Sequence, residues 1–193
     1  MNRREGLEKV VLPSFSLAER DRRWNAVRKA MAQRGIDCLV VTGSTEKWDH
    51  FFADVRYLSH IGGNCTQAFV VFPLNEEPTC IIREKVRADF WIMAQDWVTD
   101  IRDSGYCHWG ETIAQRLKEL KLEKSTIGIT GLRALRAPEG FLPSETYHRI
   151  VEALPQAKLV SASDLVAGVR QIKSAEEIVF MQKAGAILDA GLE

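Results

Sequence analysis

The sequence predicts an α/β fold in three layers, with a six-stranded, mixed, mostly parallel sheet flanked by helices. Helix-type and strand-type hydrophobic patterns alternate along the chain. The run from Cys38 to Val41 is continuously apolar, which is typical of a strand covered by helices on both faces. The runs Ala68 to Phe72 and Thr79 to Ile82 are joined by a connection too short for a parallel crossover, so these two strands are expected to pair antiparallel.

The first element is expected to be a helix from about Leu17 to Arg34. Ser16 and Glu19 have the spacing of a capping box, in which each residue satisfies a free backbone amide of the other. Apolar residues then recur at helical intervals as far as Gly35. The three strands named above follow this helix.

The remaining elements continue the alternation of helices and strands. They are expected as helices near Glu84 to Ala94, Glu111 to Leu120 and Ser144 to Leu154, and as strands near Val98 to Ile101, Thr126 to Ile129 and Lys158 to Val160. Strands separated by helices favour parallel pairing, which makes the sheet mixed and mostly parallel.

The composition limits the possible functions. The chain has 193 residues, enough for one well-filled core, since domains commonly hold roughly 100 to 200 residues. Its 26 basic and 26 acidic residues balance, so no net field attracts nucleic acid or an anionic membrane. No run reaches the roughly 18 to 20 apolar residues of a membrane span, and the amino terminus lacks a signal-peptide pattern. We expect a cytoplasmic protein without a nucleic-acid or membrane partner.

The residues that usually carry chemistry form no complete site. The four histidines make no HxH or HExxH pattern, and the four cysteines make no CxxC pair. We therefore expect no catalytic residue, no metal ligand and no cofactor within this chain.

Two tryptophans form a candidate surface for a ligand. Trp91 and Trp97, with Arg83, Arg87 and Arg102 nearby, are able to present aromatic and cationic groups together. The alternative is that both indoles pack the core while the arginines extend to solvent.

The segment from Ala53 to Gly63, ADVRYLSHIGG, resembles a stretch in the amino-terminal domain of the creatinase, prolidase and Xaa-Pro aminopeptidase family. The family pattern reads N-[IV]-x-Y-L-[ST]-G. Asp54 stands where Asn is usual, and His60 stands where Gly is usual. These departures put the substrate class in doubt more than the fold.

The segment from Val169 to Ile187 resembles the connection that follows this domain in the same family. Arg170, Lys173, Ser174 and Glu177 all fall at the spacing of the pattern R-x-[IV]-K-S-x-x-E. The resemblance implies that residues 1–169 form a creatinase/prolidase-type amino-terminal domain. It implies that residues 170–193 form an inter-domain linker and the first helix leading toward a missing catalytic domain.

In that family the catalytic domain has a pita-bread fold and binds two divalent metal ions, commonly manganese, cobalt or zinc. Its ligands are two Asp, one His and two Glu, none of which has a counterpart in this sequence. The resemblance also implies that the amino-terminal domain forms a homodimer and restricts access of a short peptide to the active site. Asn64, Gln67 and Trp91 are the candidates for such substrate gating.

Ser174 and Glu177 have the spacing of a second capping box, which predicts the start of the last helix. This helix is apolar on nearly every side. Between Ile178 and Leu188 only Gln182 and Lys183 are strongly polar, and such a helix is normally buried. Its missing neighbour would be the catalytic domain. The alternative is that Gly191 ends the helix and that its apolar faces pack against the domain itself or a second copy.

The resemblance implies a non-catalytic amino-terminal domain of a metal-dependent hydrolase, an Xaa-Pro dipeptidase or aminopeptidase. A creatinase-type amidinohydrolase or lyase is the first alternative, because the same architecture serves other substrates. A free-standing, catalytically silent binding module is the second. On any of these interpretations, we expect the 193-residue chain alone to be inactive.

Overall fold

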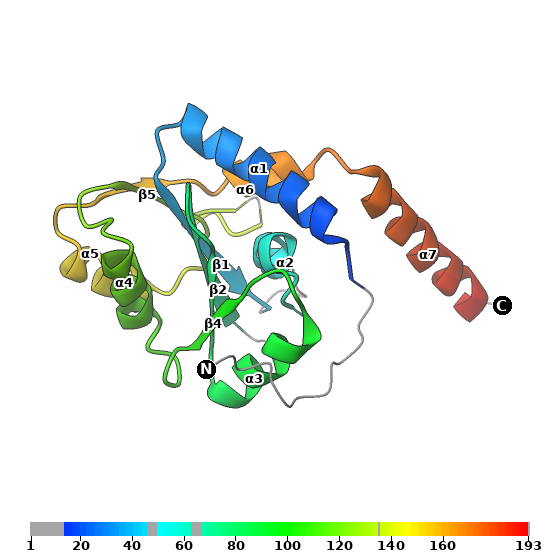
Figure 1. Cartoon of the computed structure of the whole chain (residues 1–193), viewed down its shortest axis with the longest axis horizontal. Helices are drawn as coiled ribbons and strands as arrows, with labels where there is room; N and C mark the ends of the chain where they lie inside the picture. The colour runs from blue at the N-terminus through cyan, green and yellow to red at the C-terminus, as the bar shows by residue number, and fades with distance from the viewer. Residues whose placement is uncertain (1–13, 46–49, 63–66, 135, 193) are drawn as a thin grey trace.

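The computed structural model describes residues 14–45, 50–62, 67–134 and 136–192. One sheet with helices on both faces makes up the domain, and a last helix projects away from it (Figure 1). The strands are β1 (Cys38–Ser44), β2 (Gln67–Pro73), β3 (Thr79–Ile82), β4 (Asp100–Asp103), β5 (Thr126–Ile129) and β6 (Lys158–Ser161). The three-layer α/β architecture is therefore confirmed.

Helices connect most of the strands. They are α1 (Leu17–Gln33), the short 3-10 helix η1 (His50–Phe52), α2 (Ala53–Ser59), α3 (Lys85–Ala94), α4 (Trp109–Glu119), α5 (Ser144–Ala153), α6 (Leu165–Arg170) and α7 (Ala175–Leu192). The sequence did not predict η1, α2 or α6, each of which is seven residues or shorter. Strand β4 begins two residues later than expected.

The six strands lie in the order β4-β3-β2-β1-β5-β6. Strand β1 pairs antiparallel with β2 and parallel with β5, and the pairs β3–β4 and β5–β6 are also parallel. The hairpin between β2 and β3 is antiparallel, with Val70 opposite Cys80. The prediction of a mixed, mostly parallel sheet is confirmed.

Two hydrophobic cores lie on opposite faces of the sheet. Leu39 and Val41 of β1 face α1, α2, α3 and α6, whereas Cys38 and Val40 face α4 and α5. This division follows from the alternation of side chains along a strand. Because β1 is buried on both faces, it has the continuous apolar sequence that predicted its position.

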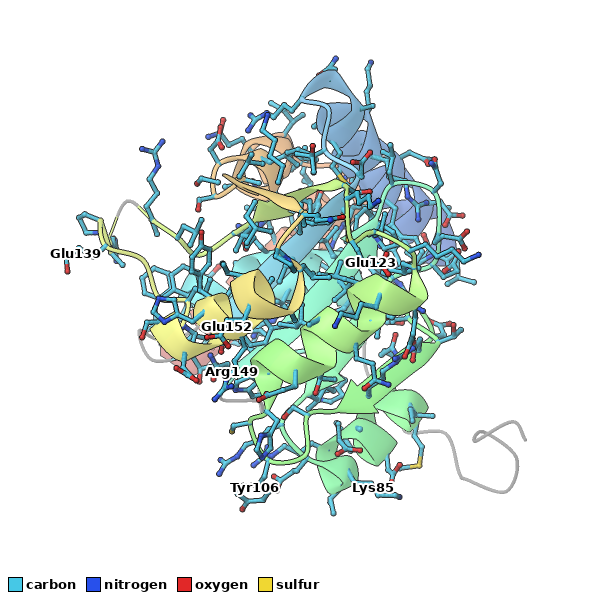
Figure 2. The ribbon with its side chains drawn as sticks, turned by 90° about the vertical axis from the view of Figure 1, so that its left-hand side faces the viewer. Lys85, Tyr106, Glu123, Glu139, Arg149 and Glu152 are labelled. Carbon is cyan, nitrogen blue, oxygen red and sulfur yellow. The ribbon has the colours of Figure 1, made fainter. Side chains whose placement is uncertain are left out.

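The outer surfaces of α4 and α5 are polar. Charged side chains, including Arg149 and Glu152, cover the face of the molecule shown in Figure 2. None of the helices in the described ranges has the length and apolar composition needed to cross a membrane.

Helix α7 differs from every other helix of the domain. No residue of it is buried, although its sequence is rich in apolar side chains. It continues past Gly191 to Leu192, so the alternative in which Gly191 ends the helix is wrong. Packing of its apolar faces against the domain itself is also wrong, because Ile187 and Leu188 are 75% and 62% exposed.

Candidate functional site: the junction before the last helix

A capping box fixes the start of α7. The backbone amide of Glu177 donates to the Ser174 hydroxyl at 3.1 Å, and the amide of Ser174 donates to the Glu177 carboxylate at 2.9 Å. Both free donors are satisfied reciprocally, as the sequence predicted from this spacing. The helix therefore begins at a defined residue.

The Glu177 carboxylate also binds α1. It lies 3.1 Å from a nitrogen of Arg22 and 3.2 Å from a nitrogen of Arg23. The same two arginines bind Glu19, at 2.8 and 2.7 Å. Burial opposes ionisation of Glu19, but the hydrogen bonds from Arg22 and Arg23 outweigh it and lower the pKa of Glu19 to about 2. Two carboxylates and two guanidinium groups thus join the linker to the first helix.

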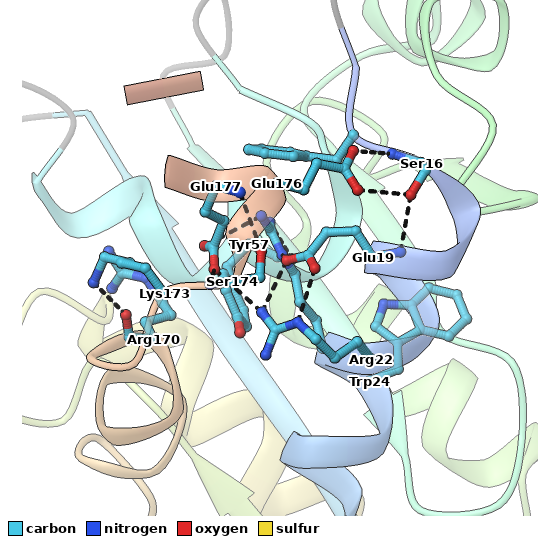
Figure 3. Close-up of polar contacts among 12 residues, drawn as sticks. Ser16, Glu19, Arg22, Trp24, Tyr57, Arg170, Lys173, Ser174, Glu176 and Glu177 are labelled. Carbon is cyan, nitrogen blue, oxygen red and sulfur yellow. Dashed lines mark hydrogen bonds and ion pairs between the residues drawn. The ribbon is translucent and has the colours of Figure 1, made fainter. Parts of the chain in front are cut away.

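Ser16 makes a second connection between the two ends of the domain. Its hydroxyl accepts a hydrogen bond from the amide of Glu19 at 3.1 Å, which confirms this half of the predicted capping box. The expected reciprocal bond to the Glu19 carboxylate is wrong, because the Ser16 amide binds Glu176 instead. Its own amide and hydroxyl donate to the Glu176 carboxylate at 2.7 and 2.8 Å. Figure 3 shows Ser16, Glu19 and Arg22 of the α1 region facing Glu176 and Glu177 of α7.

The linker itself is held by Arg170 and Lys173. A guanidinium nitrogen of Arg170 lies 2.7 Å from Oδ1 of Asp54, in the first turn of α2. Lys173 turns back and donates to the carbonyl oxygens of Arg170 and Gln171. The four linker residues singled out in the sequence, namely Arg170, Lys173, Ser174 and Glu177, are therefore brought together by one local structure.

The Arg23 guanidinium is enclosed by aromatic rings. It lies 4.3 Å from the ring centre of Phe15, 4.4 Å from that of Tyr57 and 5.2 Å from that of Trp97. These contacts add cation–π attraction to its ion pairs with Glu19 and Glu177. Since Arg23 is almost fully buried, the junction depends on its carboxylate partners.

His60 ends α2 in a conformation that favours glycine. Its φ is 58°, in the left-handed region, and its amide donates to the carbonyl of Arg56. This explains physically why the related pattern has Gly at this position. Burial lowers the pKa of His60, and the positive charge of Arg23 lowers it further.

A pocket of about 420 Å³ opens between this junction and the first turns of α7. Arg23, Arg56 and His60 line it from the domain, and Phe180 and Met181 line it from α7. The lining is mostly carbon, and α7 supplies one wall. The site is therefore a junction between the domain and its last helix.

The candidate gating residues lie apart from this junction. Gln67 is the first residue of β2 and pairs with Ser44 of β1, at the end of the sheet where β1 finishes. Asn64 lies outside the described residues. Trp91 is only 6% exposed and belongs to the core on the α1 side of the sheet. The core-packing alternative is thus correct for both Trp91 and Trp97, and a gating role for Trp91 stays a prediction.

Within the described ranges, no group of three or more His, Cys, Asp or Glu side chains is arranged to hold a metal ion. The described residues therefore offer no ligand set for a pair of divalent metal ions. We derive no metal-dependent step from this chain.

Comparison with known proteins agrees with this architecture. A curated relative, an uncharacterised hydrolase/peptidase (y4tL) of Sinorhizobium fredii, is 29% identical over 187 residues. The match covers 93% of this chain and 45% of the relative. The chain thus spans less than half the length of that protein.

Solved structures share the fold. The prolidase of Thermococcus sibiricus matches with a TM-score of 0.64 and 15% identity, over 92% of this chain and 43% of that chain. An Xaa-Pro aminopeptidase of Streptococcus pyogenes matches with a TM-score of 0.58 and 18% identity, over 80% and 100% of the two chains. These similarities show the fold of the chain. It is an α/β domain of the kind found in these two solved structures.

The family is defined by sequence. A family model described as the Creatinase/Prolidase N-terminal domain matches residues 23–172, most of the chain. The chain belongs to this family.

Sequence reasoning missed the partners of the linker residues. In the sequence, Asp54 was recognised only as a departure from the family pattern. Ser16 was recognised only as the cap of the first helix. Their contacts with Arg170 and Glu176 span 116 and 160 residues. No local spacing signals such pairs. The only sequence feature that related these parts of the chain was that the segments 53–63 and 169–187 both resemble the same family.

Proposed function

We propose that this chain is the non-catalytic amino-terminal domain of a metal-dependent hydrolase that cleaves Xaa-Pro bonds in short peptides. The observation that carries the proposal is the exposed apolar surface of α7. Its start is held by a capping box and by ion pairs to α1, yet Met181, Ile187 and Leu188 have no cover within the described chain. An apolar helix that begins at a fixed position requires a partner surface.

The partner surface in this proposal is a catalytic domain that follows α7 in the longer protein. That domain would bind two divalent metal ions, manganese, cobalt or zinc, and these would activate water for attack on the scissile carbonyl. The relative from Sinorhizobium fredii, of which this chain matches 45%, leaves room for such a domain. The proposed location is the cytoplasm.

The proposed roles of the present domain are dimerisation and substrate gating. A loop that reaches the active site of the partner subunit would limit the length of the peptide. Asn64 and Gln67 are the proposed contacts, since both come shortly after the Tyr57–Ser59 segment, which resembles the family pattern.

The test uses the full-length gene product that contains this chain. It is treated with a chelator, reloaded separately with manganese, cobalt or zinc, and assayed with Ala-Pro, Ala-Ala, an Xaa-Pro-Xaa tripeptide and creatine. We expect metal-dependent hydrolysis of the Xaa-Pro substrates only, and no turnover by the 193-residue chain. Turnover of creatine alone would instead establish an amidinohydrolase, and no turnover of any substrate would favour a binding module.

Gating is tested separately in the same protein. The double variant Asn64→Ala and Gln67→Ala is expected to hydrolyse longer peptides relatively faster than the wild type. Light scattering of the two proteins shows whether the change also alters dimerisation. An unchanged preference for peptide length would contradict the gating role without affecting the assignment of the reaction.

A further inference from the structure

A second pocket, which shares Arg170 with the junction pocket, lies at the carboxyl ends of β1, β5 and β6. Its volume is about 260 Å³. The segments that follow these three strands all contribute to its lining. They include Phe51 and Asp54 after β1, Arg133 and Phe141 after β5, and Ser163 and Arg170 after β6.

The topology of the sheet creates this pocket. Strands β1 and β5 are parallel neighbours, but the chain leaves them toward opposite faces. After β1 it enters α2, which packs in the same core as α1, and after β5 it enters α5, which packs in the core with α4. Diverging connections leave a crevice between them, and open α/β sheets commonly bind ligands at such a position.

The charge of the lining favours an anion. Its ionisable residues are three arginines, Arg133, Arg136 and Arg170, and one carboxylate, Asp54. The carboxylate is already bound by Arg170 at 2.7 Å. Across the described parts of the chain, the Arg133 guanidinium forms no ion pair within 4.0 Å. Its charge acts on Asp164, but Arg34 already binds that carboxylate at 2.9 Å. A planar guanidinium offers paired donors that match the geometry of a carboxylate or a phosphate.

The loop that carries Arg133 has a closely packed conformation. Gly131 and Gly140 both have a φ of 83°, and a Cβ added to Gly140 would lie 2.4 Å from the Gly131 carbonyl oxygen. The amide of Phe141 donates to that carbonyl at 2.9 Å, and the amide of Arg133 donates to the Ser163 hydroxyl at 3.4 Å. The residues that make these contacts, Gly131, Arg133, Gly140 and Phe141, lose little conformational freedom when a ligand binds.

An aromatic pair forms the apolar part of the pocket. The rings of Phe51 and Phe141 stack with their centres 4.3 Å apart and an interplanar angle of 14°. Phe51 is buried, whereas Phe141 is partly exposed. A ligand bound by Arg133 would therefore also contact the exposed part of the Phe141 ring. This favours an organic anion over a simple inorganic one.

We propose that this pocket binds a small organic acid. Its carboxylate accepts hydrogen bonds from Arg133, with Arg136 and Arg170 adding positive charge, and its carbon body packs against Phe141. The ion pair of Asp54 with Arg170 lines another side of the pocket, and its two charges offset each other. This ligand is independent of the peptide substrate proposed above.

The test is a titration of the isotope-labelled 193-residue chain followed by amide chemical shifts. Sodium benzoate and inorganic phosphate are the probes, added at constant ionic strength. We expect saturable shifts with benzoate that cluster in residues 51–54, 131–141 and 163–170. The variant Arg133→Gln, which changes an exposed side chain, is expected to weaken benzoate binding about tenfold.

Two further variants complete the design. Phe141→Leu is expected to weaken benzoate binding while leaving any phosphate response unchanged, and Arg149→Gln on α5 is the control that leaves both unchanged. Equal affinity of the wild type and Arg133→Gln for benzoate would overturn the proposal. Shifts scattered over the surface, or phosphate bound as tightly as benzoate, would also overturn it. Thermal unfolding of each variant verifies that it is folded.

Discussion

A guanidinium nitrogen of Arg170 lies 2.7 Å from Oδ1 of Asp54, so the linker is fastened to the first turn of α2 across 116 residues of sequence. Burial raises the pKa of Asp54, although the positive charge of Arg170 opposes that rise. The related family pattern has Asn at this position. An amide would keep the acceptor for Arg170 and avoid the cost of a buried charge.

The contact between Asp54 and Arg170 predicts different effects on stability for two substitutions of Asp54. Asp54→Asn is expected to leave the free energy of unfolding within about 1 kcal/mol of the wild type, because Arg170 keeps a partner. Asp54→Leu is expected to lower it by about 2 kcal/mol, because Arg170 then has none. Urea denaturation at neutral pH measures both values. Equal stability of the two variants would show that the contact contributes nothing.

The low pKa of Glu19 predicts how stability depends on pH. Its carboxyl titrates at about 2 in the folded chain and near 4.5 when unperturbed. Between these values the unfolded state binds more protons, so stability falls as pH falls from about 5 to about 2. Glu19→Gln is expected to flatten this fall and to reduce stability at neutral pH.

The control for Glu19 is Glu152→Gln, an exposed change on α5. Urea unfolding at a series of pH values compares the three proteins. The wild type and Glu152→Gln are expected to have the same slope. A slope unchanged in Glu19→Gln would mean that Arg22 and Arg23 do not hold this carboxylate ionised.

The left-handed conformation of His60 predicts a difference between two small replacements. Both His60→Gly and His60→Ala remove the ring from its contacts with Phe15 and Trp97. Only Gly adopts a φ of 58° without strain, so His60→Gly is expected to be more stable than His60→Ala by about 1 kcal/mol. Thermal and urea unfolding measure the difference, and the reverse order of stability would refute the strained conformation.

His60 also predicts an NMR observation in the wild-type chain. Burial and the nearby charge of Arg23 lower its pKa below the ordinary value of 6.5. The folded state therefore disfavours the protonated ring, and stability supplied by the neutral ring is lost as pH falls below about 6.5. A titration of the ring carbon-bound protons measures this pKa directly. A value above 6.5 would contradict the burial and charge described here.

The capping box predicts local loosening of α7. Ser174→Ala removes the acceptor for the Glu177 amide and is expected to cost about 1 kcal/mol at the helix terminus. Hydrogen exchange of amides 175–178 should become faster, while the sheet amides keep their protection. Ser161→Ala, on the exposed edge strand β6, is the matched control. Unchanged exchange at residues 175–178 would show that the ion pairs of Glu177 suffice.

The exposed surface of α7 predicts binding of an apolar dye to the chain in solution. The double variant Ile187→Lys and Leu188→Lys is expected to lower the fluorescence of bound anilinonaphthalene sulfonate at least about twofold, because it removes a contiguous apolar patch. Val86→Lys changes an isolated apolar side chain that is 78% exposed and serves as the control. Equal loss of fluorescence in both proteins would argue against a sticky face on α7.

Local patterns predicted the regular elements of the fold. The run from Cys38 to Val41 marked a strand buried on both faces, and Ser16 marked the start of α1. The short connection after β2 correctly required an antiparallel pair. Each of these signals depends on residues close together in sequence, so no knowledge of the tertiary structure was needed.

The elements that were missed lack such signals. Helix α2 has seven residues and no side-chain cap, and α6 has six residues and also no side-chain cap. Their apolar residues Val55 and Leu165 are fixed by contact with the core rather than by a repeating pattern. The same distinction between local and distant contacts applies to the junction before α7. The capping box of Ser174 was predicted, whereas the partners of Glu176 and Arg170 were not.

The contact between Ser16 and Glu176 has a consequence for folding during synthesis. The two residues are 160 positions apart, so α1 leaves the ribosome long before its partner exists. Domains acquire contacts of such separation late, because closing the intervening chain costs entropy that the contact alone does not repay. The sheet can therefore assemble first. The contact of α7 with Ser16 then forms last, and it fixes the orientation of α7 only after the rest of the domain has folded.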